Sequence, residues 1–199
     1  MKPIDSLQLL QQLQKNVESL LFRAINLREI DAEYLKKSRH PESWSVLQII
    51  EHLNSYNKYY LPQIELELER AATRGIPSSS RYTPGWFGNY FTRMMAPRDE
   101  KNKKKYKAPK DHTPPKSLDA VKVINDFIKG QNQLLRLLAR AKTSDLGKIK
   151  VSISISKLIK LKLGDTFRFV IAHQLRHFQQ LEVTLSEVAG IPVESPLKR

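Results

Sequence analysis

The sequence predicts an all-α protein, a four-helix bundle with a long crossover between its second and third helices. Two observations lead to this prediction. Apolar residues recur at the 3.6-residue spacing of a helix in four long stretches, at about 5–25, 45–72, 117–142 and 165–189. About 45 residues separate the second stretch from the third, which lets these two helices run parallel, whereas short loops enforce antiparallel neighbours.

The composition is that of one globular domain. The chain has 199 residues, of which 40% are hydrophobic and 27% charged, so it is too apolar for a disordered protein. A chain of this length can bury a substantial core, and no internal repeat divides it. We therefore expect a single domain over residues 1–199.

The first two helices carry recognisable start signals. Asp5 precedes Gln8 by three residues, and Ser45 precedes Gln48 by the same interval. Both pairs are typical of a helix N-terminus, where the first side chain caps free backbone N–H groups. Pro62 lies within the second helix and removes one backbone donor, which predicts a kink.

The connection at 73–116 is rich in glycine, proline and serine and predicts irregular chain. Its aromatic residues Trp86, Phe87, Tyr90 and Phe91 suggest that the middle of the connection packs against the body of the protein. Residues 98–116 hold eight Lys/Arg against three acids, and the whole chain has a net charge of +14. This segment is interpreted as a solvated basic loop, and we expect its residues 101–110 to be more mobile than the helices. The alternative is that it binds an anionic partner such as nucleic acid.

The second half of the chain supplies the other two helices. Ser117 is the expected cap of the third helix, and Gly190 followed by Pro192 is expected to end the fourth. Between them, apolar and polar residues alternate at 149–155 with the period of a β-strand. We expect this segment to be extended across the bundle without a strand partner.

Several classes of function are excluded by what the sequence lacks. The chain has no cysteine, which excludes disulfides, thiolate ligands and a cysteine nucleophile. It has no run of 18 apolar residues and no apolar signal-peptide core near the start, so we expect a cytoplasmic protein with no membrane partner.

Two histidines on the fourth helix are candidate metal ligands. His173 and His177 lie four residues apart, so both rings project from the same helix face as Val170 and Leu181. Buried imidazoles need partners, and a divalent cation would be one. Residue 174 is glutamine rather than glutamate, so the HExxH motif of zinc peptidases is not present.

His52, near the start of the second helix, is a candidate third ligand. On its own, a histidine in such a position is more often a core residue hydrogen-bonded to a neighbour. The run from Trp44 to Leu53, WSVLQIIEHL, followed by His173-x-x-x-His177-x-x-Gln180, resembles the paired motifs of DinB-like proteins. The resemblance covers essentially the whole chain.

The resemblance implies an up-down-down-up four-helix bundle, often dimeric, that binds zinc or nickel. It makes His52, His173 and His177 the metal ligands and leaves a coordination position open for water or substrate, which is typical of catalytic zinc. Gln180 is then a candidate for a residue that does not bind the metal itself but interacts with the ligand His177. No role is expected for His40 or His112, and Glu51 and Arg176 are interpreted as charges at the surface or bundle edge.

Two functions fit these observations. The first is a metal-dependent hydrolase or thiol-dependent transferase that acts on a small molecule and, in the second case, uses an external low-molecular-weight thiol. The alternative is a nucleic-acid-associated or anion-binding protein in which the metal is structural. The open three-ligand site favours the first, and the basic loop favours the second.

Overall fold

The computed structural model describes residues 1–97 and 107–190 and is mostly helical, as predicted. Four long helices dominate it: α1 (Ser6–Asn26), α3 (Val46–Thr73), α5 (Ala120–Ala141) and α6 (Leu163–Ala189). The shorter helices are α2 (Ala32–Lys36) and α4 (Trp86–Met95), with 3₁₀ turns η1 (Leu27–Glu29) and η3 (Lys110–His112). None of the described helices is long and apolar enough to cross a membrane.

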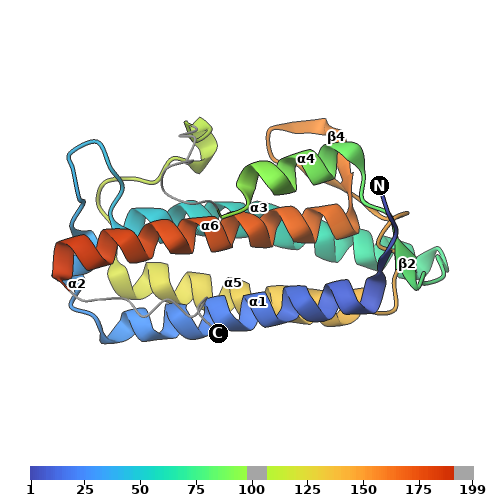
Figure 1. Ribbon diagram of the computed structural model, residues 1–199, viewed down its shortest axis with the longest axis horizontal. Helices are drawn as coiled ribbons and strands as arrows, with labels where there is room; N and C mark the ends of the chain where they lie inside the picture. Colours follow the sequence, from blue (N-terminus) through green and yellow to red (C-terminus); the bar gives the residue numbers. More distant parts are fainter. Residues whose placement is uncertain (98–106, 191–199) are drawn as a thin grey trace.

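The long helices lie side by side along the longest axis of the molecule (Figure 1). α1 contacts α5 and α6, and α3 also contacts α5 and α6. The colours in Figure 1 show that the chain runs in one direction along α3 and α5 and in the opposite direction along α1 and α6. α3 and α6 are therefore antiparallel neighbours, which is the arrangement that positions the histidines.

Local capping fixes most helix ends where the sequence predicts them. The Asp5 side chain accepts a hydrogen bond from the Gln8 backbone N–H, Ser45 and Gln48 form a complete capping box, and Gly190 ends α6 with a φ of 65°. The predicted cap at Ser117 is wrong, because Asp119 caps α5 through the backbone N–H of Lys122. α3 continues through Pro62 as one helix.

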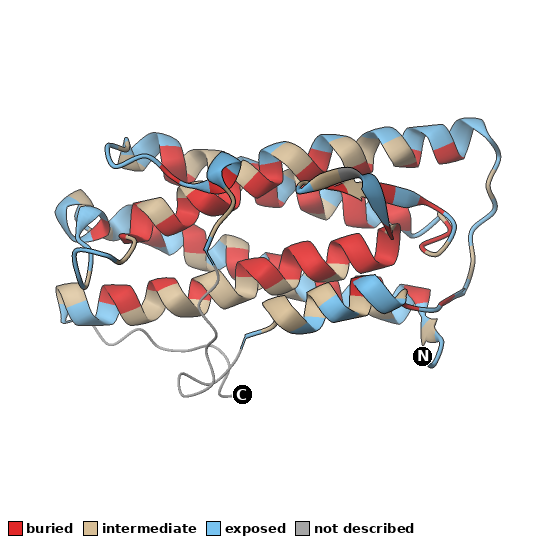
Figure 2. Ribbon diagram, turned by 90° about the horizontal axis from the view of Figure 1, so that it is seen from above, coloured by how far each residue is buried: buried red, intermediate tan, exposed pale blue. Residues whose placement is uncertain are grey.

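Two clusters of apolar side chains form the core, one at each half of the long helices. Figure 2 shows the buried residues gathered on the helix faces that point inward. One cluster includes Tyr60 and Phe167, and the other includes Leu53 and Phe178. Leu175, between His173 and His177 in sequence, packs against both clusters, so the histidine-bearing turns lie where the clusters meet.

The expectation of an unpaired extended segment at 149–155 is wrong. The chain there forms β3 (Lys150–Ile153), which turns back and pairs antiparallel with β4 (Ser156–Lys162), with Val151 opposite Leu161. A second pair joins β1 (Ile4–Asp5) to β2 (Arg81–Tyr82). The fold is thus helical with two small sheets, since backbone groups in an extended segment need partners.

The connection at 73–116 is also less irregular than predicted, because it contains α4. α4 contacts α6 and Phe91 packs against the core, so the middle of the connection lies against the body as expected. Trp86, Phe87 and Tyr90 themselves are 70%, 58% and 54% exposed. Residues 98–106 of the basic segment lie outside the described residues, so the expectation that 101–110 is mobile falls mostly outside them.

Candidate metal centre

Three histidines from two helices meet at one place. His52 is in the second turn of α3, and His173 and His177 are one turn apart in the middle of α6. One ring nitrogen of each lies within 4.8 Å of the others, although 121 residues separate His52 from His173 in sequence. His52 and His173 are buried, and His177 is partly exposed. The structure thus brings together all three residues singled out in the sequence.

A backbone carbonyl sets the orientation of His52. Its Nδ1–H donates to the carbonyl oxygen of His112 over 2.7 Å. A neutral imidazole carries one proton, so Nε2 keeps a free lone pair. That Nε2 faces the Nε2 of His173 at 3.3 Å, which leaves the lone pair of His52 directed into the cluster.

Gln180 has the same effect on His177. The Nδ1–H of His177 donates to the amide oxygen of Gln180 over 2.9 Å, and this oxygen can only accept. The Nε2 lone pair of His177 is therefore free. Such outer hydrogen bonds are the usual means by which proteins fix the tautomer and direction of a ligating histidine.

The donor set fits a divalent cation. Two nitrogens bound to one tetrahedral zinc at about 2.0–2.1 Å lie about 3.3–3.4 Å apart, and the Nε2 atoms of His52 and His173 are 3.3 Å apart. Neutral imidazoles suit zinc, nickel and related transition metals. The described residues show no carboxylate or further histidine in this cluster.

All three imidazoles are held neutral, as metal ligands must be. Burial lowers the pKa of His52 to about 4, although the hydrogen bond to the His112 carbonyl opposes the shift. Burial, together with the neighbouring His52, lowers the pKa of His177 to about 3. Burial also lowers the pKa of His173 well below its ordinary value. Protons therefore compete weakly for the lone pairs at neutral pH.

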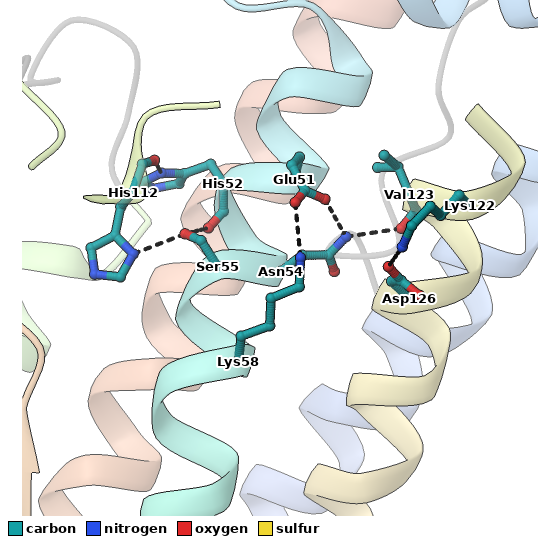
Figure 3. Close-up of polar contacts among 9 residues, drawn as sticks. All are labelled: Glu51, His52, Asn54, Ser55, Lys58, His112, Lys122, Val123 and Asp126. Carbon is teal, nitrogen blue, oxygen red and sulfur yellow. Dashed lines mark hydrogen bonds and ion pairs between the residues drawn. The ribbon is translucent and has the colours of Figure 1, made fainter. Parts of the chain in front are cut away.

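The turn of α3 that carries His52 is fixed from two sides (Figure 3). On one side, the Ser55 hydroxyl donates to the carbonyl of His52 over 2.6 Å and contacts Nδ1 of His112 at 2.9 Å, which secures the loop that supplies the His112 carbonyl. On the other side, the Asn54 amide donates to Glu51 and to the backbone carbonyl of Val123 on α5. The helix turn that carries the His52 ring is therefore held in place on both sides.

Aromatic rings enclose the histidines. Trp44 lies with its ring centroid 4.8 Å from that of His52, and Tyr56 lies 4.4 Å from His173. The His112 ring stacks on Tyr56 at 3.9 Å. Burial, with Tyr60 nearby, raises the pKa of Tyr56 to about 12, so this phenol stays protonated and can donate a hydrogen bond. The walls around the donors are apolar, a setting that strengthens electrostatic interactions within it.

A cavity of about 390 Å³ opens beside the histidines. His52, His173 and His177 contribute to its wall, together with Tyr56 and Gln180. The remaining lining residues come from the 39–44 loop, the end of α4, the 107–109 loop and α6: Arg39, His40, Glu42, Ser43, Trp44, Met95, Lys107, Ala108, Pro109, Arg176 and Val183. This volume suits a small molecule.

Sequence reasoning missed two features of this site. His112 was assigned to a polar loop without a role, yet it is buried and its carbonyl orients His52. Arg176 was interpreted as a surface or edge charge, yet it is half-buried, donates to the Met94 carbonyl and lines the cavity. No sequence motif signals either contact, because both depend on where the connections before α5 and after α4 come to lie.

The comparisons with known proteins give one positive finding. A family model described as the DinB superfamily matches residues 8–181, which is most of the chain and includes all three histidines and Gln180. Neither the curated proteins nor the solved structures contain a significant match.

Proposed function

The chain belongs to the DinB superfamily, and from this membership and the histidine cluster we propose that it is a metal-dependent enzyme. In this proposal His52, His173 and His177 bind one divalent cation, zinc or nickel, and Gln180 orients His177. The enzyme acts on a small molecule in the adjoining cavity, as a hydrolase or a thiol-dependent transferase. The observation that carries the proposal is the convergence of three neutral imidazoles on the wall of a cavity.

The position of the cluster favours catalysis over a purely structural role. A structural zinc site usually has four protein ligands, whereas a catalytic one has three and leaves a position open. The described residues offer three donors, and His177, on the side of the cavity, is the least buried of them. A bound cation would act here as a Lewis acid and would lower the pKa of a coordinated water or thiol.

The surrounding residues have distinct proposed tasks. The His112 carbonyl and the Gln180 amide oxygen hold the protons on Nδ1 of His52 and His177 and so keep their Nε2 atoms unprotonated. Tyr56, protonated at neutral pH, donates a hydrogen bond to a substrate oxygen or sulfur in the cavity. Trp44 and Tyr56 exclude water from the ligands. Because the chain lacks cysteine, a thiol substrate must come from outside.

We also propose the finer features of the architecture. The four long helices form an up-down-down-up four-helix bundle within a single domain, supported by the chain directions in Figure 1. A cytoplasmic location and a homodimeric state complete the proposal. Sedimentation velocity on the purified chain measures the oligomeric state directly.

Metal analysis of the purified protein tests the proposed function first. Protein without an affinity tag, stripped with a chelator and titrated separately with Zn²⁺ and Ni²⁺, should bind one equivalent of at least one of them. The metal-loaded protein should then hydrolyse some members of a panel of small electrophilic substrates, or should transfer an added small thiol to them. The metal-free protein should do neither. Failure to bind any divalent cation would refute the proposal.

The net charge of +14 supports a second candidate, a nucleic-acid-associated protein in which the metal is structural. Phosphate contacts release counterions, so such binding would weaken steeply as the salt concentration rises. Retention on duplex DNA with a steep salt dependence, combined with no metal-dependent turnover, would favour this alternative.

A further inference from the structure

One surface of the molecule exposes large apolar side chains from two elements. On α4 these are Trp86, Phe87 and Tyr90, which are 70%, 58% and 54% exposed. On the β3–β4 hairpin they are Ile155, Leu158 and Ile159, which are 63%, 95% and 42% exposed. We call these six residues the α4–β4 surface. Single exposed apolar residues are common on proteins, but a group of six large ones marks an interaction site.

The two elements are neighbours in the fold. α4 and β4 contact each other, and Figure 1 shows both above α6 on the same side of the molecule. Within α4, the Trp86 ring stacks on Tyr90 with centroids 6.1 Å apart and meets Phe87 at 4.9 Å. The opposite side of α4 is already used, because Phe91 and Met95 pack against the core. The outer aromatic residues are therefore not needed to hold α4 in place.

The segments that build this surface are basic and contain no acid. No Asp or Glu occurs in 70–98 or in 146–164, whereas Arg93, Lys150 and Lys160 occupy exposed positions there. The nearest acid in the adjoining helix, Asp165, is buried and accepts hydrogen bonds from Tyr82 and from the backbone of Gly85. Among the residues that the structure describes on these two segments, an approaching anionic surface therefore meets the cations Lys150 and Lys160 beside the apolar side chains.

We propose that the α4–β4 surface docks on an anionic lipid bilayer. Tryptophan and tyrosine favour the boundary between lipid headgroups and acyl chains, while exposed leucine and isoleucine enter the acyl region. Lysine and arginine near the membrane each add attraction to anionic lipids. The sequence predicts no membrane partner because no segment can span a bilayer, but a contact at the surface needs no spanning segment.

Charge and side-chain type favour lipid over other occupants. A second copy of the chain docked through the same surface would bring two basic, acid-free segments together, and like charges repel. Single-stranded nucleic acid could stack its bases on Trp86 and Tyr90. It would leave Leu158, the most exposed apolar side chain on this surface, without a partner, whereas a bilayer accommodates aromatic and aliphatic groups together.

Vesicle binding by the full chain tests the proposal. The protein should co-sediment with vesicles of phosphatidylcholine containing 30 mol% phosphatidylglycerol, bind vesicles of phosphatidylcholine alone at least about tenfold more weakly, and dissociate partly at high salt. Lipids brominated in their acyl chains should quench tryptophan fluorescence, because Trp86 enters the interface.

Two pairs of matched variants locate the contact. Leu158→Ser and Trp86→Ser should each weaken vesicle binding by about tenfold. Phe22→Ser and Val121→Ser, on α1 and α5, remove apolar side chains that are 65% and 71% exposed and should leave binding unchanged. None of these substitutions alters net charge. Circular dichroism should show the same helical content in all four variants, since none removes a core residue.

Three outcomes would overturn the proposal. The first is the absence of binding to anionic vesicles, and the second is equal loss of binding in all four variants. The third is a finding that Leu158→Ser and Trp86→Ser convert a dimer into a monomer, or abolish binding to single-stranded DNA, while leaving vesicle binding intact. That result would assign the surface to a second copy of the chain or to nucleic acid.

Discussion

The histidine cluster and the α4–β4 surface break the usual rule of burial in opposite directions. At the cluster, the rings of His52 and His173, which could be charged in water, are buried, and Nδ1 of His52 and of His177 each has a defined partner. At the surface, large apolar side chains are left 42% to 95% exposed to water. Each arrangement costs folding free energy. Both regions are recognisable as candidate sites because the burial of their side chains is the opposite of what the polarity of those side chains predicts.

The largest expected effect lies at the cluster. His173→Ala should lower the affinity for Zn²⁺ or Ni²⁺ by more than about 100-fold. Loss of an outer hydrogen bond to a metal ligand already lowers metal affinity by about 10–100-fold, and loss of the ligand itself should lower it more. Elemental analysis after dialysis measures the metal, and circular dichroism should show a folded helical protein. His52→Ala and His177→Ala should behave alike, and His40→Ala is the matched control. Stoichiometric metal in any of the three cluster variants would show that its residue is not a ligand.

Acid should destabilise the metal-free protein. His52 has a pKa of about 4 when folded, below the ordinary 6.5, because of burial. Between these values the unfolded chain binds more protons, so the free energy of unfolding falls as pH falls from about 6.5 towards 4. His177, lowered to about 3, adds to the same trend.

Urea unfolding in the presence of a chelator, at several pH values, measures this effect. His52→Gln should flatten the dependence, whereas the surface variant Trp86→Ser should leave it unchanged. An unchanged slope in His52→Gln would contradict the assignment of the effect to the buried cluster.

Removing the support of His177 should have a smaller effect on the metal. Gln180→Ala leaves all three ligands in place but removes the acceptor for Nδ1 of His177. Affinity should fall by about 10–100-fold, measured by competition with a chelating dye. Gln180→Glu keeps an acceptor and should restore much of the loss, while Gln11→Ala, on the exposed side of α1, serves as the control.

The contact that holds α4 in place should tolerate little change. A Cβ added to Gly88 would lie 2.1 Å from Cγ of the buried Asp165, so Gly88→Ala must push α4 away from α6. We expect a loss of about 1–3 kcal/mol in the free energy of unfolding, measured by urea denaturation, with the exposed Ser78→Ala as control. A neutral result would mean that α4 is loosely held, and the α4–β4 surface would then not be a rigid platform.

The smallest effect on stability is expected on the α4–β4 surface. Trp86→Ser should change the free energy of unfolding by less than about 0.5 kcal/mol, as is usual at exposed positions. The buried Phe167→Ala should cost about 3–5 kcal/mol by the same measurement. A large loss in Trp86→Ser would show that the aromatic residue serves the fold rather than a partner.

Local interactions explain what the sequence by itself determined. A cap at Asp5 or Ser45 involves atoms three residues apart, and His173 and His177 share a helix face because of helical geometry alone. The same holds for the end of α6 at Gly190. These features are properties of short segments, so their residue patterns are sufficient to predict them.

Long-range contacts decided the rest. The pairing of β3 with β4 was missed because a strand pattern does not identify the segment with which the strand pairs. α4 was missed because it is only 10 residues long and lies in a connection rich in glycine, proline and serine. The burial of His112, the orientation of His52 and the place of Arg176 in the cavity wall depend on how connections pack against α3 and α6. The sequence determined which residues could bind a metal. Only the tertiary structure, by packing α3 against α6, brought one ring nitrogen of each of the three histidines within 4.8 Å of the others.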